Sequence, residues 1–463
     1  MPSASNNRPN ILFIMTDDHA ANAMSCYGSK INETPHMDRM AAEGMRLDNC
    51  FCSNSICTPS RATILTGQYS HVNGVYTLRD ELDGSRDNVA KMLRRAGYQT
   101  AVIGKWHLYS DPTGYDYWIV LPGQGLYHDP IFIEMGKGER KIKGYATDLI
   151  ADMSIEWLQN RDNSRPFFLL CHHKAPHRPW EPDEKHARMY EDIDIPEPDS
   201  LFDDYQNRSQ AAANAKLKIG EDMHEGDLKR EIPPGLKGND LRRWAYQIYI
   251  KDYLRCVASI DDNVGRLLDY LDEEGLTDNT VVIYTSDQGM FLGEHGYYDK
   301  RFMYEESLRM PFVVRYPPEI KPGTVNDDIV LNNDFAPLFL DYAGVDVPAE
   351  MPGRSFRPVL AGNTPEDWQT SMYYRYWMHL AHHGVPAHYG VRTKRYKLIY
   401  YYGEPLGKSG AVDEPTEPEW ELFDLAKDPY EMNNAYDDAA YADAVRELRA
   451  ELYQLKEEVG DTE

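Results

Sequence analysis

The chain has 463 residues, of which 42% are hydrophobic and 27% charged, so it can bury a large core as an ordinary globular protein. Its net charge of −26 argues against nucleic acid as a partner, and no apolar run approaches the ~20 residues of a membrane helix. The length allows one large domain and a smaller one.

The first ten residues are polar and lack the charged start and apolar core of a signal peptide. Six cysteines are scattered along the chain without a disulfide framework. Unless a secretory signal has been removed, we expect a cytoplasmic protein with reduced thiols. Cys50, Cys52 and Cys57 lie close in sequence, but they lack the second CxxC or His pair that a zinc site would need.

Residues 10–16 form a short, mainly apolar run that predicts a buried parallel strand, and Asp17 and Asp18 follow it directly. Open α/β sheets bind their ligands at the carboxyl ends of such strands. Adjacent carboxylates repel unless a cation lies between them or one pKa is raised, and hard divalent metals prefer their oxygens. We therefore predict a metal site here; an exposed acidic turn is the alternative.

A helix and a strand are predicted next. Thr34 and Pro35 indicate the capped start of a helix that runs to Gly44, with an apolar face that includes Met37. A strand-like run follows at residues 47–52.

Cys57 occupies a loop-to-helix junction, because Pro59 suits a first helical turn and Gly67 can end the helix. A side chain there meets the free N–H groups and positive end of the helix, which lower the pKa of a thiol and attract anions. Arg61, one turn further on, adds a fixed positive charge. We predict an anion site with a reactive group at its floor; the alternative is a structural cysteine before a short helix.

A helix over residues 88–96 and a buried strand over residues 100–104 continue the pattern. Lys105 and His107 follow the strand, two residues apart on extended backbone, so their side chains are expected to point the same way. Near a nucleophile such a pair could bind an anion and move a proton.

Residues 146–159 predict an amphipathic helix and residues 166–171 another strand. A histidine-rich stretch follows the strand, and we expect His172 and His173 to pack in the core or to support neighbouring groups.

Residues 181–240 are polar, acidic and interrupted by Pro and Gly. We interpret them as an insertion or lid over the site, in part mobile. A long helix over residues 241–274 follows, because its apolar residues recur at helical intervals and Gly275 can end it.

Residues 280–286 predict a further buried strand that ends in Asp287 and Gln288. This ending mirrors the one at Asp17 and Asp18, and it supplies further oxygen ligands. We expect His295, a little further on, to be structural.

Past residue 371 the chain changes to Tyr-rich strands and a closing helix over residues 439–459. We therefore predict an α/β fold: a large, mostly parallel sheet flanked by helices in residues 1–370, and a small antiparallel sheet with one helix in residues 371–463. Four histidines cluster in the second part, where a loop lining the substrate cleft is favoured over a metal site: His379, His382, His383 and His388.

Residues 57–67 carry Cys-x-Pro-Ser-Arg, then four residues and Thr-Gly, without a departure from the signature of type I sulfatases, which this chain resembles. The segments TPHMDRMAAEG at residues 34–44 and GKWH at residues 104–107 are also similar to that family, in the same order. The resemblance implies an alkaline-phosphatase-like fold and hydrolysis of sulfate esters. Many relatives have Asn where Gln288 stands, and either amide offers a carbonyl oxygen.

The resemblance also implies the chemistry. Cys57 would be oxidised to Cα-formylglycine by a formylglycine-generating enzyme, and its hydrated aldehyde would attack sulfur. A divalent cation, Ca²⁺ with Mg²⁺ as the alternative, would bind Asp17, Asp18, Asp287 and Gln288. The sulfate would be held by Arg61, Lys105, His177 and Lys300. His177 or Lys300 would protonate the leaving oxygen, and His107 would deprotonate position 57 to release sulfate.

The substrate is the least specific part of the resemblance. Residues 114–130 and 172–180 look most like bacterial sulfatases that act on sulfated carbohydrates, including N-acetylglucosamine 6-O-sulfatases. The alternatives are a phosphonate monoester or phosphodiester hydrolase of the same superfamily, and a catalytically inactive protein that binds sulfated glycans.

Overall fold

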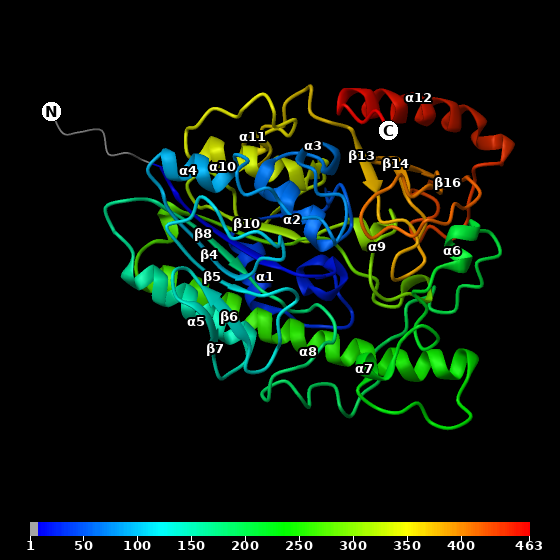
Figure 1. The fold of residues 1–463 in the computed structure, drawn as a ribbon, viewed down its shortest axis with the longest axis horizontal. Helices are drawn as coiled ribbons and strands as arrows, with labels where there is room; N and C mark the ends of the chain where they lie inside the picture. Colours follow the sequence, from blue (N-terminus) through cyan, green and yellow to red (C-terminus); the bar gives the residue numbers. More distant parts are fainter. Residues whose placement is uncertain (1–7) are drawn as a thin grey trace.

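The computed structural model describes residues 8–463, so residues 1–7, part of the segment expected to carry no targeting signal, lie outside it. A ten-stranded mixed sheet lies at the centre of the described chain, and a four-stranded antiparallel sheet lies at one end (Figure 1). Within residues 8–463, none of the helices combines the length and apolar character needed to cross a membrane. All six cysteines are unpaired.

Ten strands make up the large sheet. In order across the sheet they are β11 (Thr324–Asn326), β2 (Met45–Leu47), β10 (Phe312–Arg315), β9 (Thr280–Ser286), β1 (Asn10–Thr16), β8 (Phe167–His172), β4 (Gln99–Lys105), β5 (Tyr117–Leu121), β6 (Ile131–Glu134) and β7 (Gly138–Lys141). The five strands from β9 to β5 are parallel to one another, whereas β10 and β6 run antiparallel to their inner neighbours.

Helices cover both faces of this sheet, which explains why the central strand β1 is buried along its whole length and mainly apolar. On β1, Phe13 packs into one core and Leu12 into the other. One face carries α2 (Cys57–Thr66), α4 (Val89–Arg95), α10 (Phe335–Tyr342) and α11 (Arg357–Leu360). The other carries α1 (Pro35–Glu43), α5 (Ala146–Asn160) and α8 (Gly238–Glu273). Short helices complete the set: α3 (Ser70–Asn73), α6 (Gln210–Asn214), α7 (Glu225–Leu228) and α9 (Glu305–Leu308).

The strand expected at residues 47–52 is divided between two sheets. Strand β2 ends at Leu47 in the large sheet, and β3 (Cys50–Phe51) pairs with β12 (Val330–Leu331) in a separate two-stranded sheet. The polar residues Asp48 and Asn49 between them are only partly buried, so the chain turns out of the large sheet there.

The start of α1 is capped differently from the expectation. The Thr34 hydroxyl accepts a hydrogen bond from the backbone N–H of Ser25 (3.0 Å) and gives no side-chain cap to the helix. Instead, the Asp261 carboxylate of α8 accepts bonds from the backbone N–H groups of His36 (3.1 Å) and Met37 (2.8 Å). The cap is therefore a tertiary contact that no local pattern contains.

The C-terminal part consists of one sheet and one helix, as predicted. The four strands pair antiparallel in chain order: β13 (Ser371–Tyr376), β14 (His388–Thr393), β15 (Tyr396–Tyr401) and β16 (Glu419–Asp424). Helix α12 (Ala442–Glu458) packs on them through Leu448 and Leu452 (Figure 1). The predicted fold class is confirmed, whereas the domain boundary after residue 370 stays a prediction.

Candidate active site

Four neighbouring parallel strands, β9, β1, β8 and β4, end at the same edge of the large sheet. Asp17 follows β1, Asp287 follows β9, Lys105 ends β4 and His177 lies just beyond β8. Parallel pairing thus brings together side chains that are far apart in the sequence, at the edge where α/β sheets bind ligands.

Three carboxylates converge at this edge. Asp17, Asp18 and Asp287 are fully buried, and one oxygen from each lies within 4.8 Å of the others. Burial and the neighbouring carboxylates raise the pKa of Asp18 to about 6 and of Asp287 to about 7. Burial opposes ionisation of Asp17 too, but the charges of Lys105 and its neighbours hold the pKa of Asp17 well below its usual range.

The amide of Gln288 completes an oxygen-rich cluster. Its Nε2 donates to Asp18 Oδ1 (2.5 Å), while its Oε1 is buried and has no hydrogen-bond partner within residues 8–463. Three carboxylates and an unpartnered carbonyl oxygen form the donor set that hard divalent cations prefer. The residues present therefore fit a divalent metal, which would relieve the repulsion among the carboxylates.

Cationic side chains surround the carboxylates. Arg61 Nε donates to Asp287 Oδ2 (2.9 Å), and Lys300 Nζ donates to Asp18 Oδ2 (2.7 Å). Lys105 Nζ forms an ion pair with Asp17. All three cations are almost completely buried, so little water screens their charge. The structure thus brings together the predicted anion-binding residues and the predicted metal ligands.

The environment of Cys57 is the opposite of the one expected for a helix terminus. Cys57 begins α2, and its Sγ lies 3.3 Å from Asp17 Oδ1 with 1% of the residue exposed. Burial and the charge of Asp17 raise the pKa of the Cys57 thiol well above its usual value. The expected lowering is therefore wrong, and an unmodified thiol here would remain protonated and a poor nucleophile.

His177 presents one ring nitrogen to the site. Its Nδ1 donates to the backbone carbonyl of Arg178 (2.7 Å), because a carbonyl can only accept. Its Nε2 lies 3.7 Å from Asp18 Oδ2, and a ring nitrogen lies within 4.8 Å of Cys57 Sγ. Burial and Lys105 lower the pKa of His177 well below its ordinary value, so the ring is neutral in this state.

His107 lies beside the start of α2, where Thr58 Oγ1 donates to its backbone carbonyl (3.0 Å). The ring is buried, its Nδ1 is unpartnered within residues 8–463, and burial lowers its pKa well below the ordinary value. No hydrogen bond in the described chain joins this ring to Cys57 Sγ, so its role in the reaction stays a prediction.

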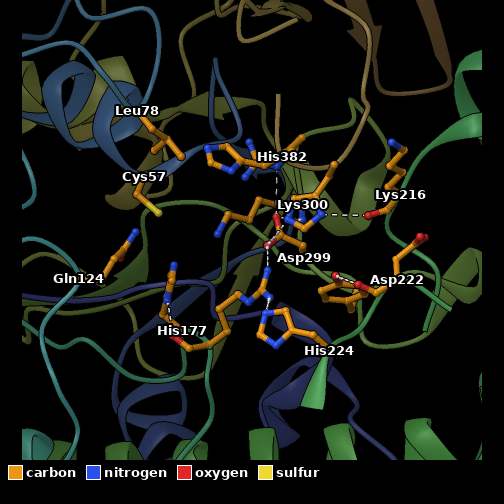
Figure 2. Close-up of a pocket in the computed structure, with 14 residues that line it drawn as sticks. Cys57, Leu78, Gln124, His177, Lys216, Asp222, His224, Asp299, Lys300 and His382 are labelled. Carbon is orange, nitrogen blue, oxygen red and sulfur yellow. Dashed lines mark hydrogen bonds and ion pairs between the residues drawn. The ribbon is translucent and has the colours of Figure 1, made fainter. Parts of the chain in front are cut away.

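A cavity of about 420 Å³ lies over Cys57, with His177 and Lys300 in its wall (Figure 2). Lys216 and His224 of the polar segment 181–240 line it, so that segment forms part of the wall, although its movement as a lid stays a prediction. The expectation for the C-terminal histidines holds for His382 and His383, which also line the cavity. His379 and His388 do not line it; both hydrogen-bond to backbone carbonyls of their own part of the chain.

Gln124 and Asp299 are two of the cavity residues that carried no prediction. Gln124 follows β5, so the rule that ligands meet strand ends could have found it. Asp299 accepts a bond from the backbone N–H of Lys300 (2.9 Å) and lies 3.3 Å from His383 Nε2. Only its position next to Lys300 in the sequence could have pointed to it.

Comparisons with known proteins cover nearly the whole chain. The family model described as Sulfatase matches residues 9–345, and one described as N-sulphoglucosamine sulphohydrolase, C-terminal, matches residues 293–458. The chain is 44% identical to the N-acetylglucosamine-6-O-sulfatase of Bacteroides thetaiotaomicron, over 98% of this chain and 88% of that protein.

Solved structures are also similar to this chain over nearly its whole length. A structure described as a complex with its substrate D-glucosamine-2-N,6-O-disulfate has a TM-score of 0.93 and 44% identity, covering 98% of this chain and 99% of that one. The phosphonate monoester hydrolase of Agrobacterium radiobacter has a TM-score of 0.77 and 22% identity, over 98% of this chain and 96% of that one. The second likeness concerns the fold alone.

Proposed function

Because the chain belongs to the sulfatase family and is a sulfuric ester hydrolase, we propose that its substrate is a sulfated carbohydrate with an O-sulfate ester of the N-acetylglucosamine 6-O-sulfate type. The 44% identity to an N-acetylglucosamine-6-O-sulfatase, over almost the whole of both chains, supports this substrate class. A structure of equal identity described with a 6-O-sulfated glucosamine as its substrate supports it further.

The observation that carries the proposal is the setting of position 57. Its side chain lies at the floor of a cavity, 3.3 Å from Asp17, among the buried cations Arg61, Lys105 and Lys300. Because the pKa of its thiol is raised, Cys57 stays protonated and is a poor nucleophile. Oxidation of Cys57 to formylglycine by a formylglycine-generating enzyme would supply, as the hydrated aldehyde, the oxygen nucleophile that the thiol does not provide.

Ca²⁺, with Mg²⁺ as the alternative, would bind Asp17, Asp18, Asp287 and the Gln288 carbonyl, and when bound would withdraw charge from a sulfate oxygen as a Lewis acid. Calcium is favoured because it accepts six to eight oxygen ligands in flexible geometry.

Residues of the chain itself would bind the sulfate and transfer the protons. Arg61, Lys105 and Lys300 provide fixed positive charge for the sulfate in a site that excludes water. His177 Nε2, which the Arg178 carbonyl leaves free, can give a proton to the leaving oxygen once the imidazole is charged, with Lys300 as the alternative donor. His107, a neutral imidazole, can take a proton from position 57 when sulfate departs.

The test is a desulfation screen on defined mono- and disaccharides, with an aryl sulfate, a phosphodiester and a phosphonate monoester as comparison substrates. We expect release of sulfate from N-acetylglucosamine 6-O-sulfate, with peptide mass spectrometry showing formylglycine at position 57, and no turnover by Cys57→Ala. A higher kcat/KM on the phosphonate monoester than on any sulfate ester would favour the related hydrolase. Full activity with Cys57 wholly unmodified would exclude the formylglycine step.

A further inference from the structure

Gln124 lies at the cavity, yet no step above uses it. It stands in a turn directly after β5, between Gly123 and Gly125, which adopt φ angles of 53° and 68°. A Cβ at Gly125 would lie 2.8 Å from Leu121 Cδ1, so the turn depends on glycine there. The turn thus presents the Gln124 side chain at the carboxyl edge of the sheet, where Lys105 ends the neighbouring strand β4.

Lys105 fixes which way the Gln124 amide faces. Lys105 Nζ donates to Gln124 Oε1 (2.5 Å). An ammonium has only donors, so the amide must turn its oxygen to the lysine and its two N–H groups away from it. Nε2 makes no hydrogen bond with any of residues 8–463, and Figure 2 shows the tip of the Gln124 side chain directed towards Cys57.

The depth of Gln124 indicates which part of a substrate it can reach. Lys105 is fully buried and Cys57 is 1% exposed, so the sulfate would occupy this floor. Gln124 is exposed on the wall above them. The alcohol that carries the sulfate must extend from the floor towards the mouth of the cavity, and the Gln124 amide is one of the polar groups on the wall there.

We propose that Gln124 contacts the sugar of the substrate, donating an N–H from Nε2 to a sugar oxygen beside the scissile ester. This inference rests on the proposed function and adds a residue that discriminates sugar sulfates from aryl sulfates. A phenyl ring offers no acceptor at that place, whereas a sugar carries hydroxyl and ring oxygens around its whole edge.

The decisive variant is Gln124→Met, which keeps the length of the side chain and removes the amide. We expect kcat/KM for N-acetylglucosamine 6-O-sulfate to fall roughly 3- to 10-fold, as for the loss of one neutral hydrogen bond. With 4-nitrophenyl sulfate, kcat/KM should stay within about twofold, and inhibition by inorganic sulfate should change little, because Lys105 loses one acceptor but keeps its ion pair with Asp17.

Two further variants distinguish a direct contact of Gln124 with the sugar from an indirect effect through Lys105 or the loop. Gln124→Glu keeps an acceptor for Lys105 but has no N–H, so its ratio of sugar to aryl activity should also fall. Leu126→Ala changes an exposed residue of the same loop that does not line the cavity, and should leave both activities unchanged. Equal losses of Gln124→Met on both substrates, or no loss on either, would overturn the inference. Wild-type enzyme inactive on every sulfate ester would instead contradict the proposed function.

Discussion

At position 57 two physical effects act on the thiol in opposite directions. The end of a helix favours an anion by about 0.3–1 kcal/mol at exposed sites and ~2 kcal/mol in favourable ones. Full burial shifts a pKa by up to about 3–5 units, each worth about 1.4 kcal/mol. Burial is therefore the larger effect, and Asp17 at 3.3 Å adds repulsion, so the pKa of Cys57 rises.

The two histidines that we propose move protons, His177 and His107, should give different kinetic signatures. His177 would serve the leaving oxygen, so we expect His177→Ala to lose about 10²–10⁴-fold on a sugar sulfate, whose alcohol leaves poorly, and far less on an aryl sulfate. His107 would serve the later release of sulfate, which is the same for every substrate. His107→Ala should therefore slow both substrates and release one equivalent of alcohol in an initial burst.

Steady-state rates and stopped-flow release of 4-nitrophenol measure both effects. A loss of equal size on the two substrates for His177→Ala would show that it does not protonate the leaving group. Absence of a burst in His107→Ala would remove that residue from the later step.

Among the elements, α1 shows how a helix terminus can depend on a distant residue. Asp261 of α8 accepts bonds from the first backbone N–H groups of α1, at His36 and Met37. Helix α1 packs against α8 beneath the sheet, so the cap joins two elements that cover the same face.

We expect Asp261→Ala to lower the free energy of unfolding by ~1–2 kcal/mol, because it removes an N-terminal cap. Asp262→Ala is the matched control: Asp262 pairs with Lys185 at the surface, where such pairs contribute less than about 1 kcal/mol. Thermal unfolding of the two variants and of the wild type measures the difference in stability. Equal shifts of the two melting temperatures would show that the Asp261 cap contributes no more to stability than the Asp262 ion pair.

The polar segment 181–240 reaches the site through α7. Asp227 holds Arg178 with two short contacts, Nη2 to Oδ1 (2.7 Å) and Nη2 to Oδ2 (2.8 Å), one residue beyond His177. The segment therefore supports the loop that carries His177, in addition to lining the cavity.

For the molecule as a whole, a net charge of −26 coexists with a cavity whose floor is cationic and whose deepest layer is a carboxylate cluster. In the metal-free protein the pKa values of Asp18 and Asp287, about 6 and about 7, exceed the unfolded value of about 3.9. The folded state then holds protons that the unfolded state has lost. The stability that these two carboxylates contribute to the metal-free protein should therefore be lost as pH rises from about 4 to about 7.

A bound metal ion would reverse that dependence, because it would bind the ionised carboxylates and release their protons. We expect chelation to abolish activity and to lower the melting temperature, and the lowering to be larger at pH 8 than at pH 5. Differential scanning fluorimetry with and without EDTA, followed by Ca²⁺ or Mg²⁺ add-back, measures this. Unchanged activity and melting temperature after exhaustive metal removal would show that the ligand assignment is wrong.

The amino-acid sequence by itself determined the elements with strong local patterns. The apolar runs at residues 10–16 and 280–286 are strands with those bounds, and α8 begins and ends within three residues of the expected helix. It also predicted a site at Cys57 and at the strand-end aspartates, from the motif at residues 57–67 and from the positions of the aspartates after apolar runs.

Only the tertiary structure decided how those groups meet. The order β9-β1-β8-β4 brings the strand ends together, and burial at that edge sets the pKa of Cys57. Asp261 caps α1 from another helix, and Lys105 orients the Gln124 amide at the cavity. Periodicity and turn residues act over a few positions along the chain. Strand order, burial and charge depend on residues hundreds of positions apart, which only packing brings into contact.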